Sequence, residues 1–282
     1  MLHFPILHRS GAMALALATL MAMPAAAETV MPANMLLSGD SGTNLEAELN
    51  ACAMFQDDLS INIKACDVAL ARRDLKRHDR ARLLHARSYA KVGVNDFRGA
   101  LRDIEKAIKL LPGVAGQEAQ QCWILAGLDE NLDRAKLSCL KSLELGSPNY
   151  RLFDSLGLIS FRKGEFQKAF TYYDIASFNG TWTPAVYGKL LSIKAYLALS
   201  DEQIALGKRS LQADGIGKVE ELNDPAGLRQ LFGGHLKVAE SAFLKFSEKE
   251  QREARASFER FGLSETTVDA AARKIMAEHP LR

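Results

Sequence analysis

The chain has 282 residues, of which 48% are hydrophobic and 25% charged, and this ordinary globular composition excludes wholesale disorder. Its formal net charge of +2 gives no case for binding nucleic acid or an anionic membrane by global attraction. Many Ala, Leu, Lys, Arg and Glu residues favour helices, and the regularly spaced Val, Ile and Thr runs of an all-β chain are missing. We therefore expect an all-α protein.

Residues 1–27 have the pattern of a secretory signal peptide. Arg9 supplies a short basic region, an uncharged and mostly apolar stretch runs from Gly11 to Met23, and Pro24 ends it before three alanines. The alternative is an uncleaved membrane anchor, but the stretch is shorter than the ~20 residues that cross a bilayer. We expect cleavage after Ala27, export to a bacterial periplasm and no membrane insertion of the mature chain. Residues 28–44 are expected to form a flexible leader.

Small residues then return with a fixed period. Four alanines recur at intervals of 35, 34 and 36 residues, at Ala100, Ala135, Ala169 and Ala205. Four residues after the first three alanines come Ile104, Cys139 and Tyr173, and seven residues after them come Ala107, Ser142 and Ala176. This spacing places each set along one face of a helix. A period near 34 residues indicates a repeat architecture.

The clearest unit runs from residue 150 to about residue 179. Its first predicted helix carries Leu156 and Gly157, and Gly164 ends that helix. Small residues at Gly157 and Ala169 allow two helix backbones to approach closely. A single hairpin of this kind cannot bury its apolar face, so neighbouring hairpins must stack.

This unit resembles the tetratricopeptide repeat, through Leu156-Gly157, Gly164, Phe166, Ala169, Tyr173 and Ala176. The resemblance covers roughly residues 52–214. More broadly, the chain is similar to exported bacterial proteins that carry such repeats together with paired cysteines. It implies a right-handed solenoid of helical hairpins over residues 45–214. The unit from Ala86 to Pro112 matches with two extra residues in its turn, and the unit of residues 116–146 has Trp123 where a small residue is expected. The unit from Pro184 onward is expected to be a degenerate repeat or a cap.

Residues 215–282 lack the period and are expected to form a C-terminal helical extension that caps the solenoid. A break at residues 215–217 precedes three predicted helices, at residues 225–246, 248–261 and 265–278. Helix starts are predicted by Thr183-Pro184, by Ser147 and Asp224, which also precede prolines, by Ser200 with Gln203 and by Ser247 with Glu250.

Four cysteines in an exported chain indicate disulfide bonds, and four allow three pairings. Aligned with the tetratricopeptide pattern, Cys122 takes the position of Leu156 and Cys139 that of Tyr173, two positions that face each other across a hairpin. The resemblance therefore implies a Cys122–Cys139 bond and leaves Cys52 to pair with Cys66. A metal site is the alternative, but it favours clustered ligands such as Cys-x-x-Cys, which the sequence lacks.

No catalytic, metal or cofactor motif stands out. The segment from Asp214 to Lys218 lacks the spacing of a phosphate-binding loop. His78 and His85 are seven residues apart, but without a third ligand they are expected to be surface or packing residues. We expect no enzyme activity.

The concave side of such a solenoid is lined by the first helix of each repeat. Basic residues outnumber acidic ones there, and two aromatic residues accompany them. This surface is typical of one that binds extended peptides or acidic segments through arginine and aromatic contacts. The alternative is a solvated face without a ligand. The predicted peptide-binding residues are Arg87, Lys91, Arg151, Asp154, Phe161, Arg162 and Tyr196.

Three functions are compatible with these features. The leading hypothesis is a periplasmic interaction or scaffold module that binds a protein or peptide in the concave groove. The second is an accessory subunit of an envelope enzyme or transport complex that docks through its C-terminal helices. The third, a hydrolase acting on cell-wall material, has no catalytic motif to support it. The sequence predicts neither the partner nor the oligomeric state.

Overall fold

The computed structural model describes residues 44–53, 58–146, 150–177, 182–204 and 225–278. All described residues belong to one compact unit. The predicted signal peptide, the predicted leader before Asn44 and the predicted break at residues 215–217 lie outside the described residues. Within the described ranges the secondary structure is helical, with no strand. The chain is all-α, as composition predicts.

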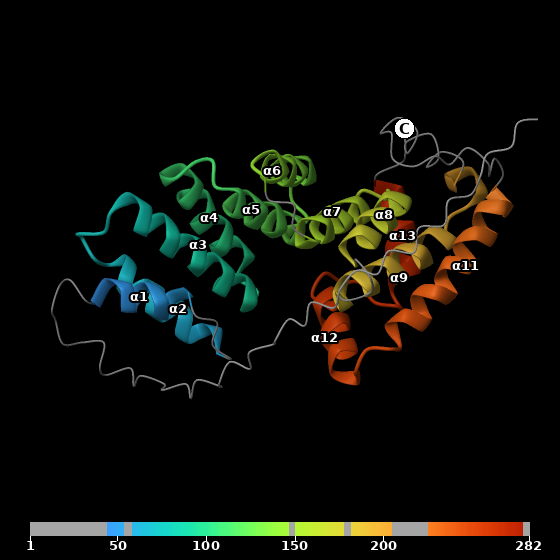
Figure 1. The fold of residues 1–282 in the computed structure, drawn as a ribbon. Coiled ribbons are helices and arrows are strands. Elements are labelled where there is room, and N and C mark those ends of the chain that lie inside the picture. The colour runs from blue at the N-terminus through green and yellow to red at the C-terminus, as the bar shows by residue number, and fades with distance from the viewer. Residues whose placement is uncertain (1–43, 54–57, 147–149, 178–181, 205–224, 279–282) are drawn as a thin grey trace, which may run out of the picture. The chain divides into compact units, whose positions relative to one another are not determined.

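The helices follow the chain in an almost uninterrupted series (Figure 1). Their bounds are α1 (Asn44–Ala53), α2 (Leu59–Leu70), α3 (Arg77–Gly93), α4 (Phe97–Leu110), α5 (Ala115–Leu128), α6 (Leu132–Glu144), α7 (Tyr150–Arg162), α8 (Phe166–Ala176), α9 (Thr183–Leu197), α11 (Pro225–Phe243), α12 (Glu248–Glu259) and α13 (Val268–Glu278).

Consecutive helices pack as hairpins, α1 on α2, α3 on α4, α5 on α6 and α7 on α8. The small-residue crossing predicted for α7 and α8 is present: a methyl group added at Gly157 would lie 2.9 Å from ring carbons of Tyr173. The turn between α7 and α8 passes through Gly164 with a φ of 74°, a left-handed conformation that favours glycine. Asn95 takes the same role between α3 and α4, where the sequence has its two extra residues.

The C-terminal helices fold back onto α9, since α11, α12 and α13 each pack against it. Phe243 of α11 and Phe258 of α12 lie 5.1 Å and 5.5 Å from the ring of Tyr187 in α9. These aromatic side chains belong to one hydrophobic core that continues from α5 through α9 to α13. The three helices begin at or within three residues of their predicted starts.

Two predicted helix caps are present, and those predicted at Ser147 and Asp224 lie outside the described residues. Ser247 and Glu250 form a reciprocal capping box at the start of α12, and Ser200 and Gln203 exchange the same pair of hydrogen bonds. The prediction at Thr183 is wrong by one residue, because α9 already includes Thr183 and its N-cap is Trp182.

Two disulfide bonds join Cys52 to Cys66 and Cys122 to Cys139, the same pairs that the repeat alignment implies. Their Cα atoms lie 4.6 Å and 5.2 Å apart, within the usual range for disulfides. Because such bonds persist in oxidising surroundings, they indicate an oxidising compartment. None of the helices in the described ranges has the length and apolar character to span a membrane.

Candidate functional site

Three residues predicted to line an open groove are buried. Phe161, Arg162 and Tyr196 are 1%, 8% and 2% exposed, so the expectation that they lie on an exposed face is wrong. Phe161 packs edge-on against Phe166 at the start of α8. Tyr196 is covered by α11, whose Phe232 ring lies 4.3 Å from it. The C-terminal helices, which lack the repeat period, thus cover a surface that the repeat alignment predicts to be exposed.

Arg162 is a structural connector between three parts of the chain. Its Nη1 donates hydrogen bonds to the carbonyls of Ala126 and Gly127 in the last turn of α5. A carboxylate oxygen of Asp129 lies 3.5 Å away, and the guanidinium stacks 5.3 Å from the ring of Phe261, beyond α12. Burial lowers the pKa of Arg162, and the charge of Asp129 opposes that shift. These contacts occupy Arg162 within the fold.

Arg87 and Lys91 are also engaged inside the chain. Arg87 donates two hydrogen bonds of 2.7 Å to the carboxylate of Asp103, and Lys91 donates a third of the same length. Burial acts to raise the pKa of Asp103, but the hydrogen bonds from Arg87 and Lys91 outweigh it and lower the pKa. Asp67 takes a further hydrogen bond from Arg87. A ligand at these two cations must compete with this buried carboxylate.

Arg151 and Asp154, one turn apart on α7, differ from the other predicted residues. Arg151 is exposed, with its guanidinium 5.4 Å from the ring of Trp182 and 5.9 Å from that of Tyr150. The Oδ1 atom of Asp154 is buried and has no hydrogen-bond partner in the described part of the chain. Burial raises the pKa of Asp154 to about 7, and the charge of Arg151 opposes the shift.

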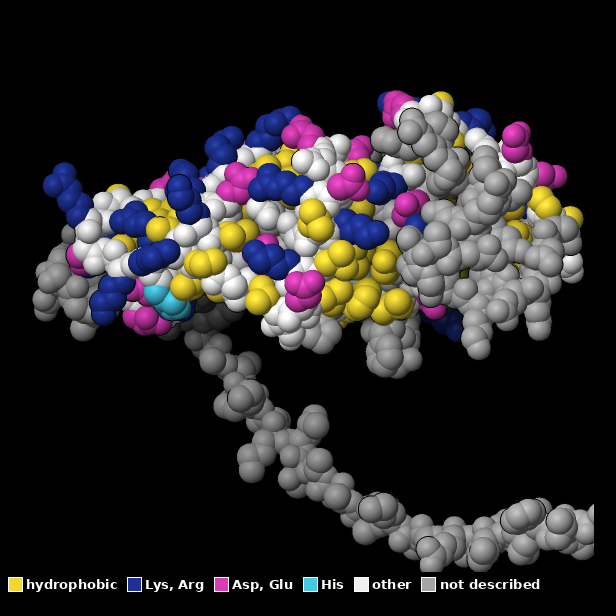
Figure 2. Space-filling view, turned by 90° about the horizontal axis from the view of Figure 1, so that it is seen from above, with side chains coloured by type: hydrophobic (Ala, Val, Ile, Leu, Met, Phe, Trp, Pro, Cys, Tyr) yellow, Lys and Arg dark blue, Asp and Glu magenta, His cyan; other side chains and the backbone are white. Residues whose placement is uncertain are grey.

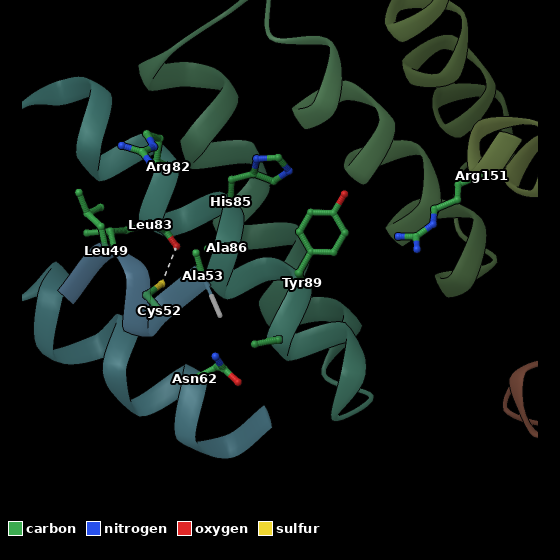
Figure 3. Close-up of a pocket in the computed structure, with 11 residues that line it drawn as sticks. Leu49, Cys52, Ala53, Asn62, Arg82, Leu83, His85, Ala86, Tyr89 and Arg151 are labelled. Carbon is green, nitrogen blue, oxygen red and sulfur yellow. Dashed lines mark hydrogen bonds between the residues drawn. The ribbon is translucent and has the colours of Figure 1, made fainter. Parts of the chain in front are cut away.

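A pocket of ≈ 390 Å³, hereafter the α3 pocket, lies between the first two hairpins and Arg151 (Figure 3). Most of its wall comes from one side of α3, and α1 contributes an apolar edge beside the Cys52–Cys66 bond. Arg82 and Arg151 lie toward opposite ends, with His85 and Tyr89 between them (Figure 3). The lining residues are Leu49, Cys52, Ala53, Asn62, Arg82, Leu83, His85, Ala86, Tyr89, Ala90 and Arg151.

The electrostatic character of the α3 pocket is cationic. Burial lowers the pKa of His85 to about 4, so the imidazole is neutral above that pH. Burial raises the pKa of Tyr89, opposed by the charge of Arg151, so the phenol is also neutral. Arg82 and Arg151 are the charged members of the lining, which contains no carboxylate. The pocket therefore presents aliphatic side chains between two positive charges.

Of the seven predicted peptide-binding residues, the structure brings Arg151 alone into the α3 pocket. Arg82 and His85 are not among the predicted residues, although the i, i+3, i+7 spacing of Arg82, His85 and Tyr89 places them along one side of α3. Among the described residues, no three His, Cys, Asp or Glu side chains gather where they could hold a metal ion.

The chain matches no protein-family model, and no curated protein matches it.

Proposed function

We propose that this protein is a periplasmic interaction module of the tetratricopeptide type, which binds a protein or peptide segment in the α3 pocket. In this proposal residues 1–27 are a signal peptide cut after Ala27, and the hairpins stack as a right-handed solenoid capped by α11 to α13. The close crossing at Gly157, the paired helices and the two disulfide bonds support it. It assigns a binding role and no catalysis.

The observation that carries the proposal is the composition of the α3 pocket. Its aliphatic wall, with Leu49, Leu83 and Ala86, suits a branched apolar side chain. Arg82 and Arg151 suit carboxylates on either side of that residue, because a guanidinium donates paired, charge-assisted hydrogen bonds to a carboxylate. The favoured ligand is thus an extended segment with an aliphatic residue between acidic ones.

A peptide-binding measurement tests this. The chain from residue 28 onward is titrated into a fluorescein-labelled peptide with Leu flanked by Glu, and into the same peptide with Gln replacing Glu. We expect the acidic peptide to bind more tightly and Arg82→Glu with Arg151→Glu to reduce its affinity at least tenfold. The matched control, Arg252→Glu with Arg273→Glu, reverses two exposed charges on α12 and α13. Equal affinity for both peptides, or equal loss in both variants, would contradict the proposal.

A second candidate function is favoured by α11. Leu231 and Val238 on this helix, and Leu244 just beyond it, are exposed although they are large and apolar. Such residues are typical of a docking surface on an accessory subunit. Co-purification from the native envelope separates the candidates: replacing these three with Ser abolishes the association if α11 docks. Reversing Arg82 and Arg151 abolishes it if the α3 pocket binds.

A further inference from the structure

Positive charge is concentrated in one region of the chain. Residues 58–110 contain thirteen Lys and Arg against seven Asp and Glu, although the whole chain carries a net charge of only +2. Figure 2 shows Lys and Arg side chains gathered over the end of the visible face where α3 and α4 lie in Figure 1. The small global charge therefore conceals a strongly basic local surface.

The exposed side of α4 carries four of these thirteen cations. Four cations at positions i, i+4, i+8 and i+11 fall within one sector of the helix, because 3.6 residues complete a turn. The start of α3 adjoins the end of α4, since Arg77 donates hydrogen bonds to the carbonyls of Lys109 and Leu110. The basic face is defined here as Lys76, Arg77, Arg98, Arg102, Lys106 and Lys109, all exposed.

The two acidic residues of α4 do not neutralise this face. Asp103 is buried beneath α4 and bonded to Arg87 and Lys91. Glu105 pairs with Arg134 at 2.6 Å, outside the basic face. In the described residues, only Arg98 of the basic face has a carboxylate partner, Glu130.

We propose that the basic face docks the protein peripherally on an anionic phospholipid bilayer. Eleven residues of helix extend about 16 Å, so neighbouring cations lie within the Debye length of ~8 Å at physiological salt and act together. A row of cations on an exposed helix side suits a laterally extended anionic surface, whereas a short peptide suits the α3 pocket. Each cation near such a surface contributes about fivefold to the partition coefficient. The proposal is independent of the peptide-binding function, because neither Arg82 nor Arg151 belongs to the face.

Vesicle flotation tests it with the chain from residue 28 onward. The vesicles contain phosphatidylcholine with about one third phosphatidylglycerol, or phosphatidylcholine alone. The test variant carries Arg102→Gln, Lys106→Gln and Lys109→Gln, which remove the charge and keep a high helix propensity. The control variant carries Lys249→Gln, Arg252→Gln and Lys274→Gln, exposed positions on α12 and α13 with the same loss of charge. Circular dichroism verifies that both are folded.

We expect the natural chain and the control to float with anionic vesicles at 50 mM salt, and the test variant to bind about a hundredfold more weakly. Binding of the natural chain should fall steeply at 500 mM salt, a readout independent of either variant. Failure to float, equal binding to neutral vesicles, or equal loss in both variants would overturn the proposal. So would displacement by millimolar inorganic phosphate, which indicates a headgroup site, or preferential binding of polyglutamate, which indicates an acidic protein partner.

Discussion

Arg162 gives the sharpest test of how the C-terminal helices are joined to the hairpins. Replacing Arg162 with Met keeps a long side chain but removes every donor. The carbonyls of Ala126 and Gly127 then lose hydrogen bonds from a buried cation, and Phe261 loses its cation–π contact. The change therefore weakens α7, the end of α5 and the segment after α12 together.

The expected cost follows from these contacts. A buried carbonyl left without its partner costs about 1–3 kcal/mol, and the cation–π contact adds about 1 kcal/mol. Relief from burying a guanidinium offsets part of this, so we expect a net loss of about 3 kcal/mol. For a unit of this size that corresponds to a melting temperature lower by about 9 °C. Lys163→Met is the matched control, because Lys163 pairs at 2.7 Å with the exposed Asp133 and contributes less than about 1 kcal/mol.

Thermal unfolding followed by far-ultraviolet circular dichroism, with urea unfolding at 25 °C, measures both variants. Arg162→Met should melt well below the natural chain, and Lys163→Met within about 3 °C of it. If the two variants melt alike, Arg162 does not connect these elements as described. If Arg162→Met leaves stability unchanged but abolishes peptide binding, Arg162 contacts the ligand after all.

Three further predictions concern packing, covalent links and pH. Gly188→Ala should destabilise the fold by about 1–3 kcal/mol, because an added Cβ would lie within 2.8 Å of two aromatic rings. Gly233→Ala is the control: an added Cβ there has no atom within 4 Å, so the change should be neutral or stabilising in the same urea assay. Replacing Cys122 and Cys139 with Ala should lower the free energy of unfolding by about 3 kcal/mol, and an unchanged urea midpoint would contradict this. Burial raises the pKa of Asp154 from 3.8 to about 7, so the folded chain holds a proton on this carboxyl more tightly than the unfolded chain does. The resulting stabilisation is fully present below pH ~4 and is lost as the pH rises through 7. The stability of Asp154→Asn relative to the natural chain should therefore rise by up to ~4 kcal/mol between pH 4 and pH 8. A stability difference that stays constant with pH in urea unfolding would contradict the raised pKa.

The hairpins were predictable because their determinants are local. Gly157 permits the crossing with Tyr173 whatever surrounds it, and Gly164 ends α7 through its own backbone conformation. The capping box at Ser247 likewise needs only Glu250, three residues on. Periodicity and capping thus predict element type and most boundaries. Trp182, one residue before the predicted cap of α9, shows that they do not fix the first residue of a helix.

The candidate site was less predictable because exposure depends on distant segments. Tyr196 lies on α9, which the repeat pattern predicts to be the first helix of a hairpin. Phe232, which covers Tyr196, belongs to α11, in a part of the sequence that lacks the repeat period. The sequence does contain a signal for the ion pair of Arg87. Asp103 lies among the small and apolar residues Ala100, Ile104 and Ala107 on the buried side of α4. A buried carboxylate needs a cationic partner, which Arg87 supplies. That pattern predicts an internal ion pair in place of a ligand contact.

The covering of α9 and the openness of the α3 pocket have a common physical origin. A terminal hairpin exposes an apolar face that must be buried, and α11 to α13 do this with Phe232, Phe243 and Phe258. At the other end, α1 is a short helix tied to α2 by the Cys52–Cys66 bond, which contributes on the order of 3 kcal/mol without requiring further apolar cover. A disulfide therefore stabilises the end of the chain that leaves side chains accessible, while packing stabilises the end that conceals them. This division supports the proposal that a ligand binds near α3, where side chains remain accessible.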